Sequence, residues 1–195
     1  MNSSNNNTLI ALKMIVFFTI LTGLLYPLLI TSLAQVAFPS EANGSLKLKN
    51  GKVIGSELIG QSFNDSVYFW SRPSSSGYNA MPGSGSNLGP TSAMLKKMVE
   101  ERKKNFITLN HLDNSVSIPS EMLFASGSGL DPHISKQSAI LQVNRVATAR
   151  KMSREQKEQL ISLIEKHTEP PQLSLFGEER VNVLMLNLDV DKIKQ

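Results

Sequence analysis

Residues 14–38 read MIVFFTILTGLLYPLLITSLAQVAF, and no charged side chain occurs from Met14 to Ser40. A helix needs about 20 apolar residues to cross the ~30 Å hydrocarbon core of a bilayer. This segment is therefore long enough to span a membrane with some tilt. The sequence predicts a single transmembrane helix over residues 13–39, followed by a water-soluble domain over residues 40–195.

A polar leader precedes the predicted helix over residues 1–12, and its first part is rich in Asn and Ser, which favours disorder. A cleaved signal peptide is the alternative to an anchor, because Ser32-Leu33-Ala34 resembles a cleavage site. Signal peptides, however, have an apolar stretch of about 7–15 residues behind a basic leader. Here the apolar stretch is nearly twice as long and only Lys13 precedes it, so we favour an uncleaved anchor.

The composition excludes several classes of site. The 195 residues include 20 Lys and Arg against 16 Asp and Glu, with 3 His and no Cys. The basic residues form no block that could follow a phosphate backbone, so we expect no nucleic-acid partner. Disulfides and thiolate metal sites are excluded, and three scattered histidines predict no metal site. The flanks of the anchor, with Lys13 before it and Lys47, Lys49 and Lys52 after it, do not decide which side of the membrane the domain occupies.

Small and hydroxyl-bearing side chains gather on one face of the predicted anchor. Thr19, Thr22, Gly23 and Tyr26 fall at helical spacing, and such residues let helices approach closely in lipid and hydrogen-bond across the contact. Pro27 supplies no N–H to the Gly23 carbonyl, which leaves an acceptor for a partner group or a threonine hydroxyl. We interpret this face as a contact for a partner helix. A passive anchor with ordinary Thr and Gly content is the alternative.

The soluble part opens with a hairpin pattern. Asn50-Gly51 lies between alternating apolar residues, and both positions of such a turn need positive φ. Residues 67–70 (Val-Tyr-Phe-Trp) and residues 180–188, which alternate with period two, predict strands. Residues 73–90 are rich in Ser, Gly and Pro and predict a long loop.

Four helices are predicted between this loop and the last strand, and together with the strands they indicate an α+β fold. Met94, Leu95, Met98 and Val99 are expected on the buried stripe of the first helix. Each helix begins at a residue typical of helix starts. These starts are Thr91 or Ser92, for a helix ending near Asn105; Pro119; Ser135; and the capping-box pattern Ser153-Arg-Glu-Gln156, whose helix stops at Pro170.

No residue pattern predicts catalysis. Ser128 lies between two glycines but outside a Gly-x-Ser-x-Gly elbow, and residues 83–89 lack the spacing of a phosphate-binding loop. Asp131, before Pro132, is expected to make a turn or to support a helix N-terminus. His133 has no second ligand or nucleophile beside it. The residues alone therefore indicate a tethered α+β domain that assists another protein.

Short motifs along nearly the whole chain also resemble one family. In order they are Tyr26-Pro-Leu-Leu, Ala42-Asn-Gly-Ser45, Leu58-Ile-Gly-Gln61, Tyr68-Phe, Arg72-Pro-Ser74, Gly85-Ser-Asn-Leu88, Ser128-Gly-Leu-Asp131, Ile134-Ser135, Arg145-Val-Ala147, Ala149-Arg150, Val181-Asn-Val and Leu186-Asn-Leu188. Each motif is weak by itself, but the ordered set is specific. The chain resembles the C subunit of the bacterial potassium-transporting Kdp P-type ATPase.

This resemblance implies a non-catalytic accessory subunit of a high-affinity, ATP-driven potassium importer in the bacterial cell membrane. The implied partners are a channel-like subunit that carries potassium and a P-type subunit that hydrolyses ATP. The implied role is to support assembly and to act as a catalytic chaperone that raises the affinity of the ATP-hydrolysing subunit for ATP. The implied topology places the N-terminus in the cytoplasm and residues 40–195 outside it.

An extracytoplasmic domain could change the affinity for cytoplasmic ATP only through the complex. Gln142 occupies the place of a family glutamine proposed to contact nucleotide, so the resemblance implies nucleotide binding there, although no phosphate cradle surrounds it in the sequence. Two other functions stay open. One is a membrane-anchored periplasmic binding module or envelope factor unrelated to ion transport, and the other is a tethered hydrolase that uses Ser128 or His133.

Overall fold

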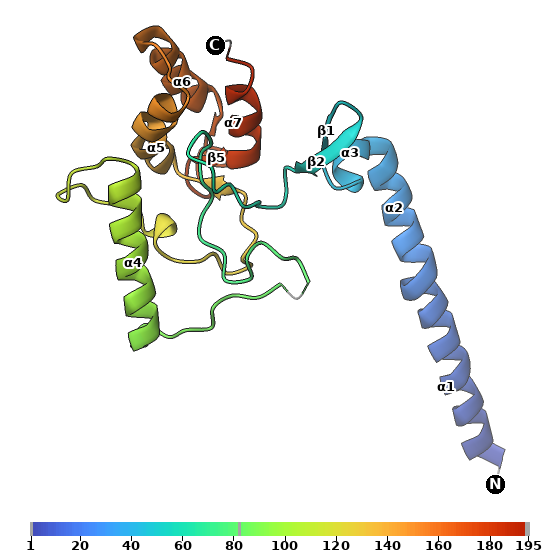
Figure 1. The fold of residues 1–195 in the computed structure, drawn as a ribbon. Coiled ribbons are helices and arrows are strands. Elements are labelled where there is room, and N and C mark those ends of the chain that lie inside the picture. Colours follow the sequence, from blue (N-terminus) through green and yellow to red (C-terminus); the bar gives the residue numbers. More distant parts are fainter. Residues whose placement is uncertain (1, 82, 194–195) are drawn as a thin grey trace. The chain divides into compact units, whose positions relative to one another are not determined.

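The computed structural model describes residues 2–81 and 83–193, and the chain divides into two units, Met1–Leu46 and Lys47–Gln195. The first unit is helical, and the second combines helices with small sheets (Figure 1). This arrangement confirms the predicted class, an N-terminal apolar helix followed by an α+β body.

The first unit is a nearly continuous helix. The part over Asn6–Ala37 is long and apolar enough to cross a membrane, and its most apolar window has no buried residue. The long helix ends where Phe38 leaves helical geometry directly before a proline. Its elements are α1 (Asn2–Ile20), the π-helical turn η1 (Leu21–Leu25), α2 (Tyr26–Ala37) and, after the break, α3 (Pro39–Ala42).

The polar leader differs from its prediction, because α1 begins at Asn2 where the sequence favoured disorder. The cost of forming a helix lies in its first turn, and each residue added to an existing helix gains a hydrogen bond. The apolar segment supplies that existing helix, and the leader extends it.

The predicted hairpin is confirmed at the start of the second unit. β1 (Leu46–Lys49) pairs with β2 (Lys52–Ser56). The turn residues Asn50 and Gly51 have φ values of 54° and 75°, as a two-residue turn of this kind requires.

The remaining strands form a three-stranded sheet in the order β3-β5-β4, with both neighbouring pairs antiparallel. The sheet is built from β3 (His133–Ile134), β4 (Thr168–Glu169) and β5 (Arg180–Asn182). Val181, at its centre, lies opposite Ile134 on one side and Thr168 on the other. Segments far apart in the sequence therefore meet at this small sheet.

The helices of the second unit begin close to where the sequence predicts. Ser92, Ser135 and Ser153 cap α4, α5 and α6 through their hydroxyl oxygens, and Ser153 and Gln156 form the predicted capping box. The short helix near Pro119 is a single 3₁₀ turn. The elements are α4 (Ala93–Leu109), η2 (Ser120–Met122), α5 (Lys136–Ala149), α6 (Arg154–Lys166) and α7 (Val183–Val190).

One apolar core holds the second unit together. α6 packs against both α5 and α7, and α5 and α7 also contact β5. Figure 1 shows these three helices grouped beside the small sheet. The core side chains come from these three helices, from β3 and β5, from α4 and η2, and from loops between the elements: Phe69, Phe106, Ile118, Met122, Ile134, Ala139, Val143, Val146, Leu160, Ile164, Val181, Val183, Leu186 and Val190.

The last predicted strand, residues 180–188, is wrong beyond Asn182. At that point the chain turns into α7, and the Asn182 side chain accepts a hydrogen bond from the backbone N–H of Met185. α7 buries residues on most of its surface, so its apolar run shows no clear helical period. A buried apolar run of this length is compatible with either a strand or a helix, and the capping asparagine is the local signal that favours the helix.

The buried stripe predicted for α4 is also wrong in part. The Met94 side chain is 64% exposed, Leu95, Met98 and Val99 are only half-buried, and Phe106 is the residue of α4 that reaches the core. Helical spacing of apolar residues predicts the helix itself, but it does not specify which neighbouring element covers the stripe.

Candidate functional site

Residues 66–70, here called the clamped segment, include the Val-Tyr-Phe-Trp run for which the sequence predicted a strand. That prediction is wrong, because the segment has no neighbouring strand. Side chains from α5, α7 and the residue after α5 take the place of that neighbour, and every backbone carbonyl of the segment accepts a hydrogen bond from one of them. The donors are Arg145 for Ser66 and Tyr68, Arg150 for Val67, Asn187 for Phe69 and Gln142 for Trp70, at 2.7–3.3 Å.

Two side-chain amides hold the apolar end of the clamped segment in the manner of a paired strand. The Asn187 amide accepts from the Phe69 N–H at 2.7 Å and donates to the Phe69 carbonyl at 2.9 Å. The Gln142 amide accepts from the Trp70 N–H at 2.7 Å and donates to the Trp70 carbonyl at 3.3 Å. Phe69 is fully buried in the core, so these amides satisfy backbone groups that water cannot reach.

The Gln142 side chain is 0% exposed, and the protein itself uses all of its hydrogen-bonding capacity. Besides its two bonds to Trp70, the Gln142 oxygen accepts from the Arg145 guanidinium at 2.8 Å, and its nitrogen donates to the Ser138 carbonyl at 3.2 Å. An amide has two donor and two acceptor positions, and all four are occupied. The nucleotide contact that the resemblance implies for Gln142 stays a prediction, and it would require this buried network to open.

Arg145 is buried, with 3% of its surface exposed, and its guanidinium carbon lies over the Trp70 ring, 3.6 Å from the ring centroid. Burial lowers the pKa of Arg145 to about 10, while the charge of Asp65 acts in the opposite direction. The guanidinium therefore stays protonated at neutral pH. Its hydrogen bonds go to neutral oxygens, including the Asn110 side chain at 2.9 Å, so carbonyl and amide dipoles hold the buried charge.

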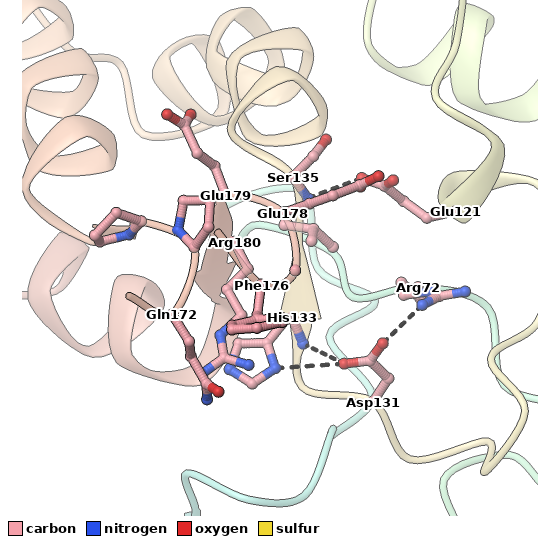
Figure 2. A pocket seen from close by; sticks show the side chains of 14 residues that line it. Arg72, Glu121, Asp131, His133, Ser135, Gln172, Phe176, Glu178, Glu179 and Arg180 are labelled. Atoms are coloured by element: carbon pink, nitrogen blue, oxygen red, sulfur yellow. Dashed lines mark hydrogen bonds and ion pairs between the residues drawn. The ribbon is translucent and has the colours of Figure 1, made fainter. Parts of the chain in front are cut away.

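A polar pocket of about 510 Å³ opens beside the three-stranded sheet (Figure 2). Arg72, which follows the clamped segment, lines it together with Asp131 and His133 at the start of β3. The segment between β4 and β5, which includes Phe176, supplies the other wall together with Arg180 at the start of β5. The structure thus brings together two motifs of the resemblance, Arg72-Pro-Ser74 and Ser128-Gly-Leu-Asp131, that lie far apart in the sequence.

Asp131 is the centre of the polar contacts in this pocket. Its carboxylate accepts from the Arg72 guanidinium at 2.7 Å and from the His133 backbone N–H at 3.0 Å, and the His133 ring nitrogen Nδ1 lies 3.4 Å from it. Burial alone would raise the pKa of Asp131, but the hydrogen bonds from His133 and Arg72 outweigh burial and lower the pKa to about 2. This confirms the turn predicted at Asp131 and adds an ion pair.

Glu121 supports the start of α5 from the opposite side of the same pocket. One carboxylate oxygen accepts from the Ser135 N–H at 2.8 Å and from the Ser138 hydroxyl at 2.6 Å. Burial opposes ionisation of Glu121, yet these hydrogen bonds keep its pKa below the ordinary value. Local sequence patterns did not identify Glu121, because the contact joins η2 to α5.

The other residues considered for chemistry stay apart. Ser128 is exposed, and its hydroxyl accepts from the Leu130 N–H in a local turn. His167 lies elsewhere, at the end of α6, where its ring is 2.8 Å from Asp189. Within residues 2–81 and 83–193, no three His, Cys, Asp or Glu side chains gather as metal ligands would. The arrangement holds polar groups in place and assembles no nucleophile with a base.

In the helical unit, the predicted partner face overlaps the π-helical turn, which contains Thr22 and Gly23, while Thr19 lies before it and Tyr26 directly after it. The Tyr26 N–H donates to the Leu21 carbonyl, five residues back, instead of following the α-helical pattern. Pro27 follows and has no N–H to donate. The Thr22 hydroxyl donates to the Phe18 carbonyl at 2.7 Å, and a side chain added at Gly23 would meet no atom of the chain within 4 Å. Turns of this kind recur at functional positions of helices.

The role of Gln142 can be tested by truncation. In Gln142→Ala, the Trp70 backbone and the Arg145 guanidinium lose buried partners, which should lower the free energy of unfolding by about 1–3 kcal/mol. Thermal unfolding of the full chain in detergent measures the change. Gln137→Ala, at an exposed position of the same helix, is the matched control and should unfold like the native chain. Equal stability of both variants would contradict the clamp.

The Asp131 carboxylate should make stability depend on acid pH. Because the folded pKa of Asp131 is about 2, against an ordinary value of 3.8 for an aspartate, its contribution to stability is nearly complete above pH 3.8 and is lost as the pH falls through 2. The loss should amount to about 1–2 kcal/mol, allowing for partial exposure. Asp131→Asn, compared with the native chain in unfolding experiments from pH 2 to pH 6, should remove that part of the pH dependence. The surface variant Glu158→Gln should leave it intact.

Comparison with known proteins gives one consistent result. The family model described as "K+-transporting ATPase, c chain" matches residues 8–192. Among curated relatives, the potassium-transporting ATPase KdpC subunit of Methylococcus capsulatus is 47% identical over 189 residues, covering 94% of this chain and 96% of the relative. The corresponding subunits of Citrifermentans bemidjiense and Herpetosiphon aurantiacus are 48% and 46% identical, covering 93% and 94% of this chain and 94% and 95% of theirs.

These matches confirm the resemblance drawn from the short motifs, and they extend through both units of the chain. The chain belongs to the KdpC family, the c chain of K+-transporting ATPases.

Proposed function

We propose that this chain is the accessory subunit of a high-affinity, ATP-driven potassium importer, held in the bacterial cell membrane by one helix and needed for assembly of the complex. The observation that supports this most is the extent of the family match, which includes both the apolar helix and the folded domain. A free-standing binding module would require no family-specific anchor sequence and no face of small and hydroxyl-bearing residues on its helix. The chain is a subunit of the ATPase and does not itself catalyse the reaction.

Its partners in this proposal are the channel-like subunit that carries potassium and the P-type subunit that hydrolyses ATP. We place the N-terminus in the cytoplasm and the domain of residues 40–195 outside it, following the family resemblance, since the charges that flank the helix favour neither side. Protease accessibility in intact cells and in inverted vesicles tests this orientation.

The proposal includes a catalytic-chaperone role, in which the subunit raises the affinity of the ATP-hydrolysing subunit for ATP. With the domain outside the cytoplasm, this effect would be an energetic coupling transmitted through the assembled complex. In that case Gln142 contributes by fixing Trp70 and Arg145 in the folded domain, a role that its four internal hydrogen bonds favour over direct contact with nucleotide.

Deleting the chain tests the proposed function. Cells that lack it should fail to grow at limiting potassium, and the remaining subunits should no longer purify as a stable complex from detergent-solubilised membranes. Restoring the native chain should restore both properties, whereas restoring residues 47–195 without the helix should restore neither. Unimpaired high-affinity uptake in the deletion strain would reject the proposal.

The partner-helix face of the anchor, composed of Thr19, Thr22, Gly23 and Tyr26, makes a separate prediction. Gly23→Leu should preserve membrane insertion, because the helix becomes more apolar, but should block close approach of a neighbouring helix. Co-purification of the larger subunits should fall, while the amount of the chain in membranes stays constant. Ala37→Leu, about four helical turns further along, is the matched control. Undiminished co-purification of Gly23→Leu would reject this face as the contact.

A further inference from the structure

The segment between β4 and β5 carries a cluster of exposed apolar side chains near its middle, here called the apolar tip: Leu173, Leu175 and Phe176. Their side chains are 84%, 80% and 65% exposed. Single exposed apolar residues are ordinary on protein surfaces, but three within four positions make a concentrated patch at the end of a projecting turn.

Backbone hydrogen bonds hold the apolar tip in a defined turn. The backbones of Gln172 and Phe176 bond to each other in both directions, at 2.8 and 2.9 Å, and the Leu175 N–H donates to the Gln172 carbonyl at 3.1 Å. Leu173 and Ser174 both have positive φ, 54° and 58°. The chain uses Asn50-Gly51 where its other hairpin needs such a turn, whereas here a bulky residue adopts a conformation that L side chains avoid.

The apolar tip therefore combines two unfavourable features, a strained backbone at Leu173 and exposed apolar side chains, and the contacts described within the second unit offset neither. Leu173 adopts a left-handed backbone conformation without burying its side chain, and Leu175 and Phe176 are also exposed to solvent. Strain of this kind persists where the surrounding structure or a partner gives a reason for it. Covering the tip would recover the exposed apolar surface.

The charges beside the apolar tip indicate what covers it. Glu178 and Glu179 follow the tip after Gly177 and are exposed, and no hydrogen bond or ion pair joins either of them to another described residue. The next residue, Arg180, is already paired with Glu169 at 2.9 Å. Figure 2 shows Phe176, Glu178 and Glu179 in the same pocket wall. Two free carboxylates disfavour an anionic lipid surface, which attracts basic segments, and they complement basic side chains.

We propose that the apolar tip, with Glu178 and Glu179, docks into an apolar pocket rimmed by Lys or Arg on another subunit of the transporter. This inference rests on the proposed function, because a c chain assembles with other subunits. Small clusters of buried apolar anchors carry much of the affinity at protein interfaces, while complementary charges at the rim fix orientation and speed association.

Site-directed photo-crosslinking in the full chain tests the contact directly. A benzoylphenylalanine in place of Leu175 should crosslink to another transporter subunit in native membranes, at a peptide that contains apolar residues and Lys or Arg. The same group in place of Met94, which is 64% exposed on α4, is the control and should give much less of that product. Crosslinks from position 175 only to lipid, or only to a second copy of this chain, would overturn the proposal.

Charge reversal then tests the acidic pair. In the position-175 crosslinking background, E178K/E179K should lower the yield of the intersubunit product by at least about tenfold, and high salt should lower it in the native-charge chain. E100K/E101K, an adjacent exposed pair on α4, should leave the yield unchanged. An undiminished yield in E178K/E179K would overturn the role of the acidic pair.

The two proposals fail in different ways. If the native chain does not co-purify with the other transporter subunits, the proposed function fails. Two results together would reject the docking of the apolar tip alone. The L173S/L175S/F176S variant would co-purify as well as the native chain at all salt concentrations, and the chain with benzoylphenylalanine at position 175 would give no crosslink to another subunit. Unchanged thermal unfolding of the triple variant, compared with L48S/L58S/M94S at other exposed positions, shows that a loss reflects contact and not folding.

Discussion

Five consecutive backbone carbonyls, from Ser66 to Trp70, depend on side chains for their hydrogen bonds. The segment has no neighbouring strand and Phe69 within it is fully buried, so without these donors each buried backbone group would stay unpaired at a cost of about 1–3 kcal/mol. The amides and guanidinium groups of α5, α7 and Arg150 prevent this. They also join the apolar core to the loop that continues to Arg72 and the polar pocket, so the geometry of that pocket depends on the clamped segment.

The dependence is mutual. The carbonyls of the clamped segment obtain their hydrogen bonds from side chains, and the buried guanidinium of Arg145 in turn obtains from those carbonyls the acceptors that stabilise its charge. Among the described residues, Arg145 donates no hydrogen bond to a carboxylate. Its charge is held by oxygens of the clamped segment, by two side-chain amides and by the ring of Trp70, with a further contribution from the charge of Asp65. Removing one partner from such a network leaves the others desolvated and unpaired, which costs more than the bond itself contributes. Four of the motifs that carry the family resemblance, those with Tyr68-Phe, Arg145, Arg150 and Asn187, contribute groups to this network. These four motifs therefore have a structural role in the folded domain.

Features with a local cause could be predicted from the sequence, and features that need a distant partner could not. The anchor, the Asn50-Gly51 turn and the serine caps of α4, α5 and α6 each depend on a few neighbouring residues. The segment 67–70 has the composition of a strand, but whether it pairs with a strand or with side chains is settled by residues more than 70 positions later. The polar residues in apolar helices, Gln142 and Asn187, were the available signal, since a buried amide must find partners. Likewise, nothing local to Arg72 indicates the carboxylate of Asp131, 59 residues further along.

A subunit that performs no chemistry must act through the surfaces it presents, and these differ from its interior. Inside the second unit, polar groups are nearly all satisfied, and Arg72 Nε is the buried side-chain atom among the described residues that lacks a partner. Outside, the apolar tip combines exposed leucines with left-handed backbone, and in the helical unit the π-helical turn precedes a proline that cannot donate. A domain with a loosely packed interior could yield when a partner binds and would transmit little. An interior whose polar groups are nearly all paired instead fixes the positions of the groups on its surfaces, because packed cores shift between discrete arrangements instead of deforming gradually.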